Sequence, residues 1–208
     1  MDTNILKVSE VTQQHLNQSQ TYAEYRTMID QLLSEGKTTG DNHSEDMLHY
    51  TKMNVQRMKR LDKTAKLNEE MLTTIASIKH SQTWVVITEA WCGDAAQIVP
   101  VLAKIAEASP KIDLKLILRD EHLDVMDAYL TDGARSIPKL IALDSETLKE
   151  LGVWGPRPTP AHEMVMERKK NNDGESYLEF ATRLHGWYAK DKTQTTQKEL
   201  AETMQRWI

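Results

Sequence analysis

The only cysteine in this 208-residue chain, Cys92, lies between an apolar run and a helix-like run. The apolar run, residues 84–87, has the composition of a buried strand, and residues 97–102 favour a helix. A thiol at such a turn meets unpaired N–H groups and the positive end of the helix dipole, and both favour the thiolate. This arrangement, more than any other feature, constrains the fold, and it predicts a reactive cysteine at a helix N-terminus.

The region around Cys92 alternates between strand and helix patterns. Strands are predicted at 83–88, 112–118 and 137–143, with a hairpin partner at 147–153, and helices at 95–108 and 122–130. The strand–helix–strand start predicts a parallel pair with a right-handed crossover, and the hairpin adds an antiparallel edge. We therefore expect an α/β fold with a mixed sheet.

Helical patterns flank this region on both sides. We divide the chain into a helical N-terminal extension (1–80), an α/β core (81–155) and C-terminal helices that pack on the core (156–208). Methionines on the predicted N-terminal helices suggest an adaptable contact surface, although ordinary core packing explains them as well. The extension is also a candidate homodimer interface.

Composition excludes several classes of function. The net charge of −5 argues against nucleic-acid binding, and no window approaches the roughly 18 apolar residues of a membrane span. Residues 1–7 lack the basic start and apolar core of a secretory signal. A single cysteine forms no internal disulfide and suits a reducing compartment, so we expect a cytoplasmic protein.

The motif around the thiol resembles the thioredoxin superfamily. The resemblance covers roughly residues 83–155 and rests on Trp91, Cys92, Gly93, Pro100, Ser136, Ile137 and Pro138. A group of bacterial thioredoxin-like proteins with a Trp-Cys-Gly-Asp site and a helical N-terminal extension is most similar. The resemblance implies a thioredoxin-like fold in which Pro138 is cis and faces the cysteine. It also implies that the backbone next to Pro138 pairs with an extended segment of a substrate protein.

Three departures from the thioredoxin pattern bear on activity. Ala95 occupies the position of the second, resolving cysteine, either naturally or through an engineered substitution. Asp94 replaces the usual proline, and Val86 sits where many thioredoxins carry a buried acid. Glu89 is a candidate substitute for that acid.

Cys92 is the expected catalytic residue, with Trp91, Gly93, Asp94, Ile137 and Pro138 as expected substrate-binding residues. A free thiol has a pKa of about 8.5, which a helix N-terminus lowers and an ionised Asp94 raises. We expect a moderately lowered pKa for the Cys92 thiol.

Two functions follow. The first is monothiol exchange with protein disulfides or small disulfides such as oxidised glutathione, in which an external thiol resolves the mixed disulfide. The alternative is a redox-inactive thioredoxin-fold binding or scaffold module in which the cysteine is inert. The seven histidines are scattered, and no phosphate-binding loop or dinucleotide fingerprint is present. We therefore expect neither a metal nor a cofactor.

Overall fold

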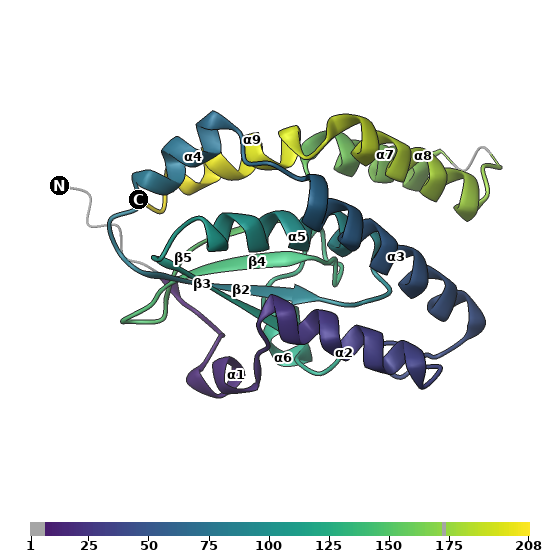
Figure 1. Cartoon of the computed structure of the whole chain (residues 1–208), viewed down its shortest axis with the longest axis horizontal. Coiled ribbons are helices and arrows are strands. Elements are labelled where there is room, and N and C mark those ends of the chain that lie inside the picture. The colour runs from purple at the N-terminus through teal and green to yellow at the C-terminus, as the bar shows by residue number, and fades with distance from the viewer. Residues whose placement is uncertain (1–6, 172–173) are drawn as a thin grey trace.

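A computed structural model describes residues 7–171 and 174–208 of the chain (Figure 1). The expectation that no secretory signal is present rests mainly on residues 1–6, which lie outside the described residues. The strands are β1 (Lys7–Val8), β2 (Gln82–Thr88), β3 (Ile112–Leu118), β4 (Lys139–Asp144) and β5 (Lys149–Trp154). The helices are α1 (Gln13–Gln18), α2 (Tyr22–Ser34), α3 (Glu45–Thr64), α4 (Glu69–Ala76), α5 (Gly93–Glu107), α6 (Leu123–Ala128), α7 (Thr159–Lys170), α8 (Tyr177–Asp191) and α9 (Gln194–Met204).

The strands of the described residues form one mixed sheet in the order β1-β5-β4-β2-β3. β2 pairs parallel with β3 and antiparallel with β4, while β5 pairs antiparallel with β4 and with β1. α5 connects β2 to β3, since parallel neighbours need a crossover. The predicted α/β mixed sheet is confirmed, and β1 is an edge strand that the sequence pattern did not reveal.

Helices cover both faces of the sheet (Figure 1). On one side α5 lies against the strands with α3 packed along it, and α4, α9, α7 and α8 form a further layer. On the other side α1 and α2 contact β3, with α6 beside them. The N-terminal and C-terminal helices also meet, because α4 packs against α9. The division of the chain into an N-terminal extension, a core and C-terminal helices therefore remains a prediction.

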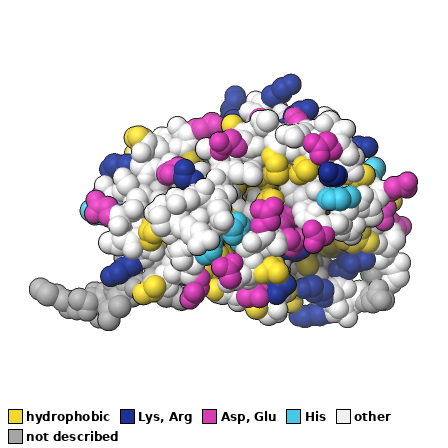
Figure 2. Space-filling view, turned by 90° about the horizontal axis from the view of Figure 1, so that it is seen from below, with side chains coloured by type: hydrophobic (Ala, Val, Ile, Leu, Met, Phe, Trp, Pro, Cys, Tyr) yellow, Lys and Arg dark blue, Asp and Glu magenta, His cyan; other side chains and the backbone are white. Residues whose placement is uncertain are grey.

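The surface on the side of α1, α2 and α6 carries acidic and basic side chains intermixed with apolar ones (Figure 2). Mixed signs are typical of a solvated surface. Among the described residues, no helix combines the length and apolar content needed to cross a membrane.

β2 forms the centre of the core, and every one of its residues is buried. Neighbours on both sides and helices on both faces explain why its sequence is an apolar run instead of an alternating pattern. Trp84 is fully buried and meets Trp207 edge-to-face at 6.0 Å. The Trp84 indole N–H donates to Gln82 Oε1, and Gln82 Nε2 donates to the Trp207 carbonyl oxygen. The C-terminal end of the chain is thus part of the core.

Two predicted boundaries differ from the structure for physical reasons. The strand predicted at 137–143 begins only at Lys139, because Pro138 has no N–H to contribute to the ladder. The C-terminal helical region predicted over 156–208 ends its last helix at Met204, and Trp207 is buried in the core.

Candidate functional site

Cys92 lies at the junction of β2 and α5, as predicted, and forms the N-cap of α5. Its Sγ accepts a hydrogen bond from the Ala95 N–H at 3.5 Å and donates to the Ile137 carbonyl oxygen at 3.4 Å. The Ile137–Pro138 peptide bond is cis. The structure therefore brings together Cys92 and Ile137, which lie 45 residues apart in the sequence.

Burial dominates the chemistry of this thiol. Cys92 is only 8% exposed, and burial raises the pKa of its thiol to about 12, with the charge of Asp94 raising it further. The Ala95 N–H and the Arg157 guanidinium lower the thiol pKa, but by less. The expectation of a moderately lowered pKa is wrong, because the loss of water outweighs the helix N-terminus.

Asp94 connects the motif to the C-terminal region. Arg157 Nε donates to one carboxylate oxygen at 2.7 Å, and the Tyr188 hydroxyl donates to the other at 2.8 Å. Burial raises the pKa of Asp94, while Arg157 and then Tyr188 lower it. Asp94 is therefore an internal anchor for α8 and for the segment after β5, and it has little freedom to contact a substrate.

Gly93 provides the space that lets α8 approach the motif. A Cβ at this position would lie 2.6 Å from His185 Nε2, well inside contact distance. Any side chain here would force His185 away, because atoms this close must shift. Gly93 is therefore required for helix packing at the site.

Gly155 brings the end of β5 against the cis-proline turn. Its φ of +108° favours glycine, and a Cβ there would lie 2.5 Å from the Pro138 carbonyl oxygen. The close approach places Arg157 next to Asp94. Sequence reasoning missed Arg157, although the Gly and Pro residues just before it marked a tight turn.

His185 and Tyr188 also escaped the sequence analysis. They lie about ninety residues beyond the motif on an ordinary amphipathic helix, and local periodicity does not show which partner such a helix meets. Their contacts with Gly93 and Asp94 emerge only from the folded arrangement.

Trp91 lies beside the motif and is partly buried. The Arg119 guanidinium stacks over its ring at 4.7 Å, a cation–π contact that holds the indole in place. Trp91 also lines a cavity together with Gly93. The predicted substrate-binding role of Trp91 is compatible with this supporting contact.

Glu89, the candidate substitute acid, is almost fully buried. Burial raises the pKa of its carboxyl group, and a carboxylate oxygen accepts the Asp120 N–H at 3.0 Å. This bond ties Glu89 to the connection after β3.

One group of side chains could be considered for a metal. In the described residues, ligand atoms of His15, His122 and Asp124 lie within 4.8 Å of one another. However, the Thr12 backbone N–H donates to His15 Nδ1, so the ring carries its proton on Nε2 and donates it to Asp124 at 3.0 Å. That nitrogen is committed to a hydrogen bond, and the group is better described as a helix cap whose histidine is hydrogen-bonded to Asp124.

Comparison with known proteins agrees with this geometry. Residues 40–173, more than half of the chain, match the protein family described as Thioredoxin. The chain belongs to the thioredoxin family. No curated protein matches it.

Two solved structures are similar to this thioredoxin-family chain. One is the crystal structure of an HIV epitope-scaffold, with 16% identity, a TM-score of 0.52 and coverage of 89% of this chain and 98% of that one. The other is a protein of unknown function from Pseudomonas aeruginosa, with 20% identity, a TM-score of 0.46 and coverage of 82% and 96%. At these identities the first likeness concerns the fold alone.

Proposed function

We propose that this thioredoxin-family chain is a binding protein in which Cys92 does not carry out disulfide exchange. The observation that supports this proposal most strongly is the burial of the Cys92 thiol. Exchange begins with attack by a thiolate. A buried thiol with a pKa of about 12 is almost entirely protonated at neutral pH. The chain also has no second cysteine to resolve a mixed disulfide.

A cavity next to the motif supports the binding role. It has a volume of about 240 Å³ and lies between α3, α8 and the turn that contains Trp91 and Gly93. Concave sites with apolar walls and a few polar groups are the usual form of small-molecule sites. Two of the predicted site residues, Trp91 and Gly93, line this cavity, whereas its lining does not include Cys92, Asp94, Ile137 or Pro138.

Monothiol exchange is the alternative, favoured by the position of Cys92 at the N-cap of α5 opposite the cis-proline turn. In this reaction the Cys92 thiolate attacks a disulfide, forms a mixed disulfide and releases one thiolate. A second external thiol then frees Cys92. The reaction requires an exposed, ionised sulfur.

The rate of Cys92 alkylation by iodoacetamide as a function of pH separates the two functions. Because Cys92 is the only cysteine, an added mass that a Cys92→Ser variant does not take up under the same conditions reports on it. We expect slow alkylation of the folded protein with no midpoint near neutral pH, and no adduct after exposure to oxidised glutathione. The same protein in denaturant is the control and should react completely. A midpoint near 7 with one thiol-reversible glutathione adduct would refute the proposal and support monothiol exchange.

A further inference from the structure

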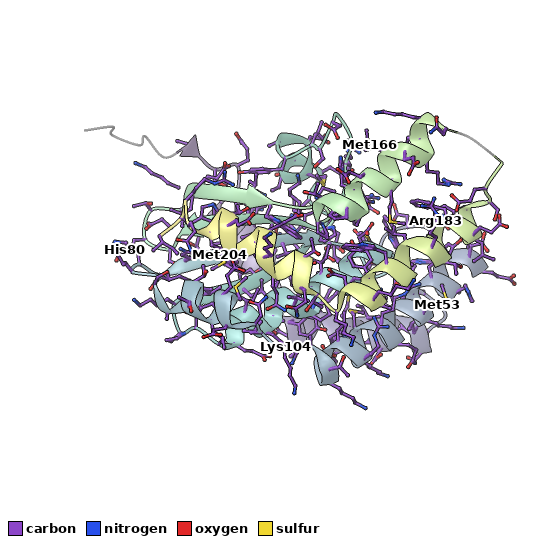
Figure 3. All side chains as sticks on the ribbon, turned by 90° about the horizontal axis from the view of Figure 1, so that it is seen from above. Met53, His80, Lys104, Met166, Arg183 and Met204 are labelled. Carbon is purple, nitrogen blue, oxygen red and sulfur yellow. The ribbon has the colours of Figure 1, made fainter. Side chains whose placement is uncertain are left out.

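The cavity beside Gly93 has an apolar rim and a polar floor. Tyr50 on α3 and Tyr177 on α8 meet edge-to-face at 5.9 Å, and Tyr177 and Leu178 are 57% and 62% exposed. Figure 3 labels Met53, which lines the cavity from α3, and Arg183 on the neighbouring α8. Large exposed apolar side chains around a hollow are typical of a ligand site.

Arg57 supplies a positive charge to the floor. Its guanidinium is half-buried and donates to Asn54 Oδ1 at 2.7 Å. Among the described residues, no Asp or Glu lies within 4.0 Å of Arg57 or Arg60 to form an ion pair. The nearby Asp94 already binds Arg157. The positive charge of Arg57 is therefore not taken up by an ion pair within the described residues, although Asp94 offsets part of it at longer range.

A chain of hydrogen bonds sets the proton on His185. Arg60 Nη2 donates to Gln97 Oε1 at 3.2 Å, which fixes the orientation of that amide. Gln97 Nε2 lies 3.3 Å from His185 Nδ1 and donates to it, so the ring proton is on Nε2. Burial, and then the charges of Arg57 and Arg60, lower the pKa of His185 to about 3, so the ring is neutral.

Both donors line the cavity and lie beside Gly93. The position that a Cβ of Gly93 would occupy is 2.6 Å from His185 Nε2 and 3.6 Å from Arg57 Nη1, so the two groups are close neighbours in the cavity wall. One guanidinium and one neutral N–H form a site for a single planar anion, since arginine matches the two oxygens of a carboxylate.

We propose that this cavity binds a small organic acid, with its carboxylate on Arg57 and His185 Nε2 and its apolar body against Tyr50 and Tyr177. The inference deepens the proposed binding function and names its ligand class. A single carboxylate fits better than phosphate, because a phosphate dianion requires more cationic partners than Arg57 alone.

Phenylacetate is a suitable probe, with phenylacetamide and inorganic phosphate as comparisons. Titration calorimetry should show that phenylacetate binds, and that the uncharged amide and phosphate bind much more weakly. Amide resonances of Gly93 and Ala181 should shift on addition of phenylacetate, because both residues line the cavity.

Variants test the assignment of the donors. Arg57→Gln keeps a donor for Asn54 but removes the charge, and should weaken binding about 10- to 100-fold. Gly93→Ala should weaken binding, because its methyl group would displace the His185 ring from its place in the cavity wall. Lys190→Gln removes a positive charge from an exposed position on α8 and should leave affinity unchanged. Unchanged circular dichroism and melting temperature would show that Arg57→Gln is folded.

The outcomes are distinct. The inference is overturned if phenylacetate does not bind at millimolar concentration, if the amide or phosphate binds equally well, or if Arg57→Gln has no effect. If Cys92 is alkylated rapidly and phenylacetate still binds, the redox-inactive function is refuted and the proposed carboxylate site still holds. Slow alkylation of Cys92 together with no phenylacetate binding would refute the proposed carboxylate site and leave the redox-inactive function standing.

Discussion

Replacing Arg157 by alanine tests the central link between the motif and the C-terminal helices. The variant removes the donor to Asp94 Oδ2 and leaves a carboxylate whose side chain is 8% exposed with only the Tyr188 hydroxyl as a partner. Removing one member of a buried ion pair typically costs about 3–5 kcal/mol, because the remaining charge is uncompensated.

Protonation of Asp94 limits this cost. In the folded variant, burial without the arginine should raise the pKa of Asp94 further above its usual value of 3.8. Keeping a carboxyl group with that reference pKa protonated at pH 7 costs about 4.4 kcal/mol, at ~1.36 kcal/mol for each of about 3.2 pH units. This figure is an upper limit for the loss relative to the parent, because burial already raises the pKa of Asp94 in the parent. We therefore expect a loss of at most about 4.4 kcal/mol at pH 7, or a melting temperature lower by at most roughly 18 °C.

The sign of the pH dependence follows from the raised pKa. A group that binds its proton more tightly in the folded state stabilises the fold at low pH and loses that contribution as the pH rises. The deficit of Arg157→Ala relative to the parent should therefore shrink as the pH falls toward the pKa of Asp94 in the parent, by up to about 1.4 kcal/mol per pH unit. Urea denaturation at several pH values measures it.

The double variant Arg157→Ala with Asp94→Asn is the matched control. It removes the charge that needs compensation, so it should be more stable than Arg157→Ala alone at pH 7, and its deficit should not vary with pH. A loss below about 1 kcal/mol for Arg157→Ala, or a deficit that is equal at pH 5 and pH 7, would refute the argument that this ion pair fastens the motif to the rest of the chain.

Three further predictions concern packing and the cavity. Gly152→Ala should lower the free energy of unfolding by about 1–3 kcal/mol, because its Cβ would lie 2.2 Å from Trp207 Nε1. Gly186→Ala, on α8 with nothing within 4 Å of the added Cβ, should instead raise it by about 0.5–1 kcal/mol; urea denaturation of both variants checks the contrast. Phenylacetate affinity should stay constant from about pH 5.5 to about pH 8, because the carboxylate and Arg57 remain charged and the pKa of His185, lowered by burial and by the two α3 arginines, leaves it neutral. Calorimetry that shows tighter binding toward the lower pH would contradict the neutral His185.

The sequence predicted those parts of the fold that depend on neighbouring residues. The apolar run at 84–87 identified β2, because a strand buried on both faces needs apolar side chains throughout. The same local pattern placed Cys92 at the start of α5. The meeting of Cys92 with Ile137 came from the resemblance to the thioredoxin superfamily, since neither residue alone shows it.

The reactivity of the thiol could not be predicted in this way. Its pKa is set by competition between the helix N-terminus, which sequence reveals, and burial, which depends on the packing of the whole chain. The same reason hid the role of His185, whose proton position depends on Gln97 and Arg60 from two other helices.

Together, the motif residues of this chain serve packing as much as chemistry. Asp94, in place of a proline, supplies the two oxygens that hold Arg157 and Tyr188. Gly93 leaves the space that His185 fills, and Ala95 offers its N–H to the sulfur where a resolving thiol would otherwise stand. The replacement of proline by Asp94 thus coincides with contacts that fasten α8 and the segment after β5 against the motif. The enclosure of the motif and the proposed binding site share one structural element, because α8 supplies both Tyr188, which donates to Asp94, and His185, which lines the cavity.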